Sequence, residues 1–166
     1  MKPWILAATA ALVLVITASV LFAHKPAPAP ELSFSTLQGQ QFRTADLRGQ
    51  VVLVNFWATS CGVCIAEMPA LKATQEKFQA RGFRTLAVSM DYDPPARVGA
   101  FFGLNPLPFT FVLDRDGRIA RGFGDVRLTP TSFVLNRRGE IVHKILGQPD
   151  FDALHRLIDT LLAEPS

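Results

Sequence analysis

The chain is 166 residues long, which is enough for one ordinary domain with a hydrophobic core and a short appendage. Its formal net charge at pH 7 is +3, from 17 lysines and arginines and 14 acidic residues. Two of the cations, Lys2 and Lys25, precede residue 31, so the remaining 15 nearly balance the 14 acidic residues. A near-neutral domain argues against nucleic acid as a partner, because binding to phosphates requires clustered positive charge.

The first 24 residues have the composition of a membrane segment. No charged side chain occurs at residues 3–23, and the apolar stretch at residues 4–22 is long enough to cross about 30 Å of hydrocarbon as a helix. A cleaved signal peptide is the alternative, but its apolar core is normally shorter, about 7 to 15 residues, and no clean cleavage site follows here. We expect residues 1–24 to be an uncleaved anchor that places the domain outside the cytoplasm.

Residues 25–30 have the sequence Lys-Pro-Ala-Pro-Ala-Pro. Alternating proline favours extended polyproline geometry and cannot continue a helix, because proline lacks an N–H group and has a fixed φ. We expect a linker here, either a stiff spacer that holds the domain away from the bilayer or a featureless connection. The folded domain is then expected to span residues 31–166.

Strand and helix patterns alternate along the first half of this domain. A short hairpin is expected from residues 32–34 and 41–43. Residues 51–57 are apolar almost throughout, as in a central strand that is covered on both faces. Residues 61–80 have helical spacing, and Pro69 is expected to kink this helix. A strand, a helix and a strand should follow at residues 84–90, 95–102 and 110–113. This order predicts an α/β fold, with a mixed sheet and helices on both of its faces.

Two segments of the second half, residues 111–119 and 133–141, have similar sequences. Each contains an apolar strand pattern and a polar turn with a glycine, so we expect a hairpin in both. Asp114 and Asp116 resemble calcium ligands, but the glycine comes too early for a calcium loop of about twelve residues, so turn residues are expected. A final amphipathic helix is expected over residues 151–162.

The chain has only two cysteines, Cys61 and Cys64, which directly follow the buried-strand pattern and open the helix pattern. A structural disulfide gains most when it closes a long loop, and this pair closes a very short one. A metal site is not expected, because the three histidines are scattered and show no ligand spacing. We therefore interpret the pair as a reversible dithiol/disulfide centre.

The positions of the two thiols predict different roles. If Cys61 caps the helix, unpaired backbone N–H groups and the helix dipole favour its thiolate, so Cys61 should attack and Cys64 should resolve the mixed disulfide. Glu67, three residues after Cys64, could exchange protons with the resolving thiol, although a solvated surface glutamate is an equal alternative. The Gly62-Val63 spacer offers the thiolate no further stabilisation, which favours a reductant over a strong oxidant.

Residues 55–69, together with residues 128–135, resemble the TlpA/ResA/CcmG branch of the thioredoxin family. The resemblance spans residues 31–163. The family pattern Trp-Ala-x-x-Cys-x-x-Cys-x-x-Glu-x-Pro is matched by Trp57, Ala58, Cys61, Cys64, Glu67 and Pro69. The resemblance implies a thioredoxin-like fold with an N-terminal hairpin and a central insertion in the region of residues 109–123.

The resemblance also implies the roles of particular residues. Glu67 should be a buried acid beside the disulfide, and Pro130 a cis-proline packed against it. Trp57, Thr129 and Pro130 should contact the substrate, Thr129 through its backbone groups. The redox group is the cysteine pair itself, with no external cofactor and no metal.

Members of this branch are membrane-tethered, extracytoplasmic thiol-disulfide reductases. By resemblance we expect an enzyme on the periplasmic side of the cytoplasmic (inner) membrane, which takes electrons from a membrane thiol carrier and reduces exported proteins such as apocytochrome c. Two alternatives stay open, namely a peroxidase-like redoxin, because Thr59-Ser60-Cys61 resembles a peroxidatic loop, and Cu(I) handling by the two thiolates with a histidine. Many members carry an aromatic residue at position 60 and a proline in the spacer, so their redox potentials do not transfer to this chain.

Overall fold

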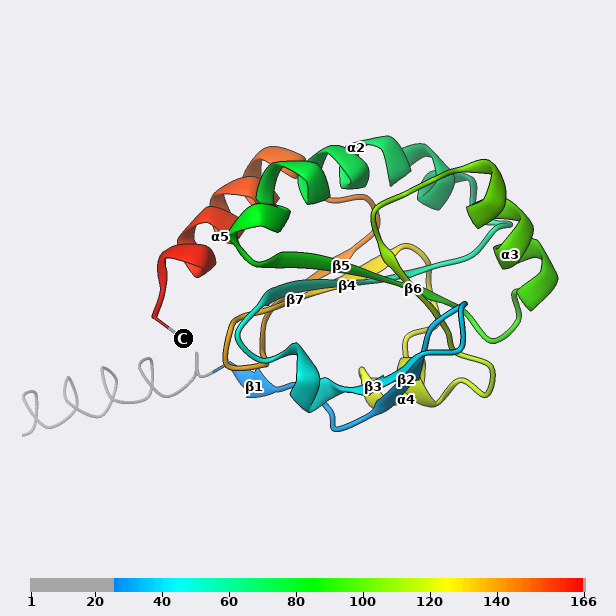
Figure 1. Cartoon of the computed structure of the whole chain (residues 1–166), viewed down its shortest axis with the longest axis horizontal. Helices are drawn as coiled ribbons and strands as arrows, with labels where there is room; N and C mark the ends of the chain where they lie inside the picture. The colour runs from blue at the N-terminus through cyan, green and yellow to red at the C-terminus, as the bar shows by residue number, and fades with distance from the viewer. Residues whose placement is uncertain (1–25, 166) are drawn as a thin grey trace, which may run out of the picture.

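A fully buried strand, β4, lies at the centre of a six-stranded mixed sheet in the computed structural model, which describes residues 26–165. β4 pairs parallel with β5 and antiparallel with β7. β6 continues the sheet beyond β5, and β8 and β1 continue it beyond β7 (Figure 1). From one edge to the other, the strands are β1 (Ala27–Pro28), β8 (Glu140–Leu146), β7 (Thr131–Leu135), β4 (Val51–Trp57), β5 (Phe83–Ser89) and β6 (Thr110–Leu113).

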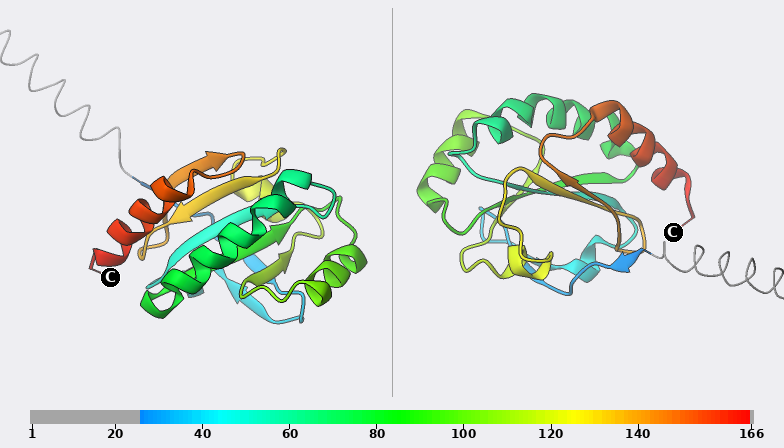
Figure 2. Two further views of the ribbon diagram at one scale, coloured as in Figure 1. Left: turned by 90° about the horizontal axis from the view of Figure 1, so that it is seen from above. Right: turned by 180° about the vertical axis from the view of Figure 1, so that it is seen from behind.

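The three longer helices of the described chain, α2, α3 and α5, share one face of this sheet (Figures 1 and 2). The other face is covered by the hairpin β2–β3, the 3-10 helix η1 and the short helix α4. Because alternate β4 side chains enter a hydrophobic cluster on each face, the strand is apolar almost throughout, as predicted. On the first face these elements are α2 (Gly62–Phe78), α3 (Pro95–Leu104) and α5 (Phe151–Ala163). On the second face they are β2 (Ser33–Ser35), β3 (Gln41–Arg43), η1 (Thr44–Leu47) and α4 (Arg118–Gly122).

Most of the predicted elements are confirmed within one or two residues. The N-terminal hairpin forms its own two-stranded sheet, and helices do cover both faces, although those on the second face are short. α2 continues through Pro69 as one helix and passes into the 3-10 helix η2 (Gln79–Arg81). Gly82, with φ of 97°, ends this helical stretch in the left-handed conformation that glycine adopts at low cost.

The hairpin predicted for residues 111–119 is wrong, because α4 follows the turn where a strand was expected. Asp114 is 2% exposed, and its two carboxylate oxygens accept hydrogen bonds from the N–H groups of Ile119 (3.0 Å) and Ala120 (2.8 Å), the second and third amides of α4. In the second copy the matching residue is Asn136, whose single amide oxygen accepts two backbone N–H groups of the tight turn between β7 and β8. The aspartate therefore starts a helix where the asparagine closes a hairpin.

The end of the expected linker belongs to the sheet. In β1, Ala27 lies opposite Ile141 and Pro28 opposite Glu140. The next residue, Ala29, is buried and donates its N–H to the carbonyl of Gly139 (2.9 Å). Proline is tolerated in an edge strand because that strand needs few ladder hydrogen bonds. The folded domain thus begins before residue 31, and the expected spacer is at least partly an edge strand.

The anchor expected at residues 1–24 lies outside the described residues. Within residues 26–165, no helix combines the length and the apolar character that a bilayer crossing requires. The insertion expected in the region of residues 109–123 stays a prediction, and the structure places β6, a turn and α4 there.

We predict that Asp114→Asn lowers the free energy of unfolding by about 1–2 kcal/mol, because the amides of Ile119 and Ala120 bond to different carboxylate oxygens and the NH2 group that replaces one of these oxygens cannot accept. Urea denaturation of the oxidised protein measures this change. Asp116→Asn is the matched control, since Asp116 lies in the same turn but is exposed, pairs with the Arg118 side chain and accepts only one backbone N–H of α4, that of Arg118, which an asparagine oxygen can also accept. The control should leave the unfolding midpoint unchanged. Equal losses in both variants would contradict the capping role of Asp114.

Candidate functional site

Cys61 and Cys64 form a disulfide at the N-terminus of α2, with their Cα atoms 5.2 Å apart. Cys61 is the N-cap residue of the helix, and its Sγ accepts a hydrogen bond from the N–H of Cys64 (3.2 Å). The free N–H groups of the first turn and the helix dipole both stabilise negative charge on a sulfur at this position. The predicted capping position of Cys61 is confirmed.

The two cysteines differ in exposure. Cys61 is partly exposed, whereas Cys64 is completely buried. A substrate sulfur can therefore reach Cys61 from solvent, while Cys64 can reach only the sulfur of Cys61 from inside the domain. This asymmetry is what an attacking and a resolving thiol require.

Glu67 lies one turn beyond Cys64 on α2 and is completely buried, so the alternative of a solvated surface residue is wrong. Burial raises the pKa of its carboxyl from 4.5 to about 7, and a hydrogen bond from Nδ2 of Asn55 to its Oε1 (3.0 Å) acts in the opposite direction. Its Oε2 has no hydrogen-bond partner among the residues that the structure describes. A carboxyl with this pKa can take up and release protons near neutral pH.

The sequence prediction missed two residues of this buried cluster, Asn55 and Ser132. They lie directly opposite each other on β4 and β7, and Nδ2 of Asn55 also donates to Oγ of Ser132 (3.0 Å). Both residues are completely buried. The signal that could have revealed them is a polar residue inside a strand that is otherwise apolar, since a buried polar group needs a partner.

The Thr129–Pro130 peptide bond is cis, as the resemblance predicted. Pro130 is buried and Thr129 is partly exposed. β7 begins directly after this proline, and its first residue, Thr131, lies opposite Phe56 on β4. Pro130 therefore lies at the end of the sheet where β4 leads into the cysteine turn.

Trp57 does not have the predicted position at the site surface. It is completely buried, and its ring packs against Phe101 and Phe111, with centroids 5.1 and 5.8 Å away. A ring enclosed in this way offers no surface to a substrate, so the predicted substrate contact is wrong. Trp57 instead fills the core directly beneath the turn that carries the disulfide.

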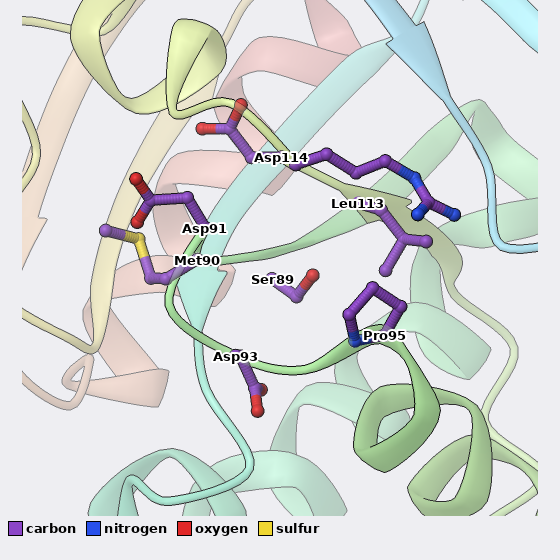
Figure 3. A pocket seen from close by; sticks show the side chains of 8 residues that line it. Ser89, Met90, Asp91, Asp93, Pro95, Leu113 and Asp114 are labelled. Atoms are coloured by element: carbon purple, nitrogen blue, oxygen red, sulfur yellow. The ribbon is translucent and has the colours of Figure 1, made fainter.

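A second unpredicted pair, Thr59 and Asp93, holds the cysteine turn in place. The carboxylate of Asp93 accepts hydrogen bonds from the N–H and the hydroxyl of Thr59, both at 2.6 Å. Asp93 is buried in the loop that follows β5, and Figure 3 shows its carboxylate directed away from Asp91 and Asp114 on the other side of the pocket. Because Thr59 precedes Cys61 by two residues, Asp93 fixes the approach to the disulfide.

A sheet of this topology, with a dithiol turn at a helix N-terminus and a cis-proline at the same end, defines a thioredoxin-like thiol-disulfide oxidoreductase. Residues 24–158 match the family described as Redoxin, and the chain belongs to this family. The redox group of such proteins is their own cysteine pair, so the chemistry requires no external cofactor. Within residues 26–165, no group of three or more His, Cys, Asp or Glu side chains could hold a metal ion.

Relatives of known activity agree with this class. The thiol-disulfide oxidoreductase ResA of Geobacillus thermodenitrificans is 34% identical over 119 residues, which cover 72% of this chain and 67% of that protein. ResA of Bacillus subtilis is 29% identical over 127 residues, which cover 76% and 70%. The chain is therefore similar to oxidoreductases over most of its length, and the predicted thiol-disulfide oxidoreductase activity is confirmed.

Solved structures show the same fold. A thioredoxin-family thiol:disulfide interchange protein from Chlorobium tepidum superposes with a TM-score of 0.75 at 26% identity, covering 84% of this chain and 98% of that one. StoA from Bacillus subtilis gives a TM-score of 0.66 at 25% identity, with 79% and 98% covered. These superpositions confirm the predicted thioredoxin-like fold.

We predict that Thr59→Val slows alkylation of reduced Cys61 by iodoacetamide at pH 7 about five- to tenfold, which corresponds to the loss of one hydrogen bond. Without the hydroxyl contact to Asp93, the turn no longer holds the thiolate against the helix N-terminus. Thr59→Ser keeps the hydroxyl and should react at the wild-type rate. Equal rates for the two variants would show that the contact does not influence the thiol.

Proposed function

We propose that this oxidoreductase is a membrane-anchored reductase that acts on disulfides of exported proteins, with apocytochrome c as its client. The observation that carries the proposal is the asymmetry of the disulfide. Its partly exposed sulfur lies at a helix N-terminus, and its buried sulfur lies one turn from a carboxyl whose pKa is about 7. The apolar stretch at residues 4–22 supports an anchor in the cytoplasmic membrane, with the domain on the periplasmic side.

In the first step, the thiolate of Cys61 attacks one sulfur of the client disulfide. A mixed disulfide forms between Cys61 and that sulfur, and the other client sulfur leaves as a thiolate and takes up a proton. Thr129 is partly exposed beside the cis-proline, and its backbone groups would hold the incoming client chain. The exposed side chains of Val63 and Leu128 would contact apolar residues of an unfolded client.

In the second step, the thiol of Cys64 transfers its proton to Glu67, and the resulting thiolate attacks the sulfur of Cys61. The mixed disulfide breaks, the client leaves with its second thiol, and the Cys61–Cys64 disulfide seen in the structure is formed. Two electrons have then passed from the protein to the client. A membrane thiol carrier would return two electrons and two protons to restore the dithiol.

The spacer supports the direction of electron flow. A strong oxidant needs an unusually stabilised thiolate, and the first turn of α2 contains no charged side chain that could supply it. The buried carboxyl of Glu67 acts against the thiolate as well, because its negative charge disfavours a second one nearby. Both features support a reductant.

We predict that Cys64→Ser traps mixed disulfides between Cys61 and exported clients, because the resolving thiol is absent. Non-reducing electrophoresis of the membrane fraction, followed by mass spectrometry, would identify these clients. Cys61→Ser should trap none and reduce no client. The idea is overturned if no client is trapped and Cys61→Ser retains reductase activity. In the wild type, a reduction potential of about −270 mV for the Cys61–Cys64 pair would support a reductase, and a potential of about −120 mV would support an oxidant.

We predict that client release accelerates as the pH rises through about 7, since only ionised Glu67 can accept the proton of Cys64. Glu67→Gln should remove this dependence and slow release about a hundredfold, the lower range for loss of a general base. Stopped-flow decay of a preformed Cys61–client mixed disulfide measures the step. Glu76→Gln is the control, because Glu76 is an exposed glutamate on the same helix that pairs with Lys72. A wild-type pH profile in Glu67→Gln would refute the proton transfer.

A further inference from the structure

The buried amide of Asn55 connects Glu67 on α2 with Ser132 on β7. Its Nδ2 donates to Oε1 of Glu67 and to Oγ of Ser132, each at 3.0 Å, and all three residues are completely buried. A side-chain amide nitrogen carries only two hydrogens, so both are used in these bonds. The three side chains form one cluster that spans the helix of the disulfide and the strand of the cis-proline.

The ionised carboxyl of Glu67 favours one orientation of this amide. If the amide turned over, its carbonyl oxygen would face the carboxyl, and two acceptors would oppose each other whenever Glu67 is ionised. The Ser132 hydroxyl accepts the second N–H and so holds the amide in place, with its nitrogen facing Glu67, once the carboxylate has selected this orientation. The cross-strand pairing of Asn55 with Ser132 keeps the two side chains in reach of each other.

The N–H donor opposes the effect of burial on Glu67. Burial favours the neutral carboxyl, whereas a donated N–H favours the ionised one. The other titratable groups nearby on α2 are the two thiols of the reduced protein. β4 and β7 present the uncharged Asn55 and Ser132, and His155 of α5 contacts α2 two turns further on, at Thr74. Among the described residues, the side-chain amide of Asn55 is thus the polar group that contacts the Glu67 carboxyl and can favour its ionised form.

We propose that Asn55 and Ser132 are positioning residues that set the protonation equilibrium of Glu67. Asn55 acts directly, by its N–H on the carboxylate, and Ser132 acts through Asn55. The inference rests on the proposed role of Glu67 as the proton acceptor of Cys64 for its effect on client release. It also predicts a change in Glu67 that is measurable without any client.

The test compares Asn55→Leu, Ser132→Ala and Ser132→Thr with the wild type. Asn55→Leu has a similar volume and no donor, and it should raise the pH midpoint of Glu67 ionisation by about one unit. Ser132→Ala should shift the midpoint in the same direction by less, because the amide stays but is less well held. Ser132→Thr keeps the hydroxyl and should titrate like the wild type. The readout is the ¹³C chemical shift of the Glu67 carboxyl in the reduced protein as a function of pH.

A merely structural role would lower stability without moving this midpoint, so wild-type midpoints in Asn55→Leu and Ser132→Ala would overturn the inference. If Asn55→Leu does not fold, the Ser132→Ala and Ser132→Thr pair still decides the outcome. Client-release rates separate the inference from the proposed function. A shifted carboxyl midpoint with unchanged release kinetics would uphold the positioning role and refute proton transfer by Glu67. In a Glu67→Gln background, Asn55→Leu should leave the pH profile of release unaltered.

Discussion

The burial of β4 on both faces is the constraint on which the rest of this structure depends. Its side chains enter the cluster beneath α2, α3 and α5 on one side and the cluster beneath the hairpin and α4 on the other. Its carboxyl end leads into the cysteine turn, and its neighbour β7 begins directly after the cis-proline at the same end. A disulfide at the start of a helix that follows such a strand has little freedom to move, so its reactivity is governed by the fixed groups around it.

Burial and hydrogen bonding act in opposite directions on the most important of these groups, the carboxyl of Glu67. Glu67 has no exposed surface, which favours its neutral form, yet Asn55 offers it an N–H that favours the charged form. The balance leaves a carboxyl that changes protonation near pH 7, one turn from the buried thiol. Before the disulfide in the chain, Thr59 donates its N–H and its hydroxyl to the two carboxylate oxygens of Asp93. Polar groups buried in this way are costly unless they are paired, and these pairings lie on the elements that carry the dithiol, α2 and the turn that precedes it.

The two similar segments differ in the buried polar residue at their turn and in the structure that follows it. Asp114 has two acceptor oxygens and begins α4, whereas Asn136 has one and closes a tight turn. The sequence pattern around them is nearly the same, so hydropathy alone predicts a hairpin twice. In the same way, the aromatic pattern of Trp57 is compatible with a surface contact or with the core. Its packing against Phe101, a residue far along the chain, decides for the core.

The sequence by itself determined the alternation of strands and helices and the redox nature of the Cys61–Cys64 pair, and the resemblance of its motifs to a known family predicted the cis bond at Pro130 and the burial of Glu67. These depend on local spacing and on residues close together in the chain, where periodicity and short motifs are informative. Only the tertiary structure decided that Asn55 and Ser132 hold Glu67, that Asp93 fixes Thr59 and that proline-rich residues form an edge strand. Each of these depends on a contact between segments far apart in sequence. The strength of an electrostatic interaction or hydrogen bond at such a contact depends on how deeply it is buried, which local sequence patterns do not predict.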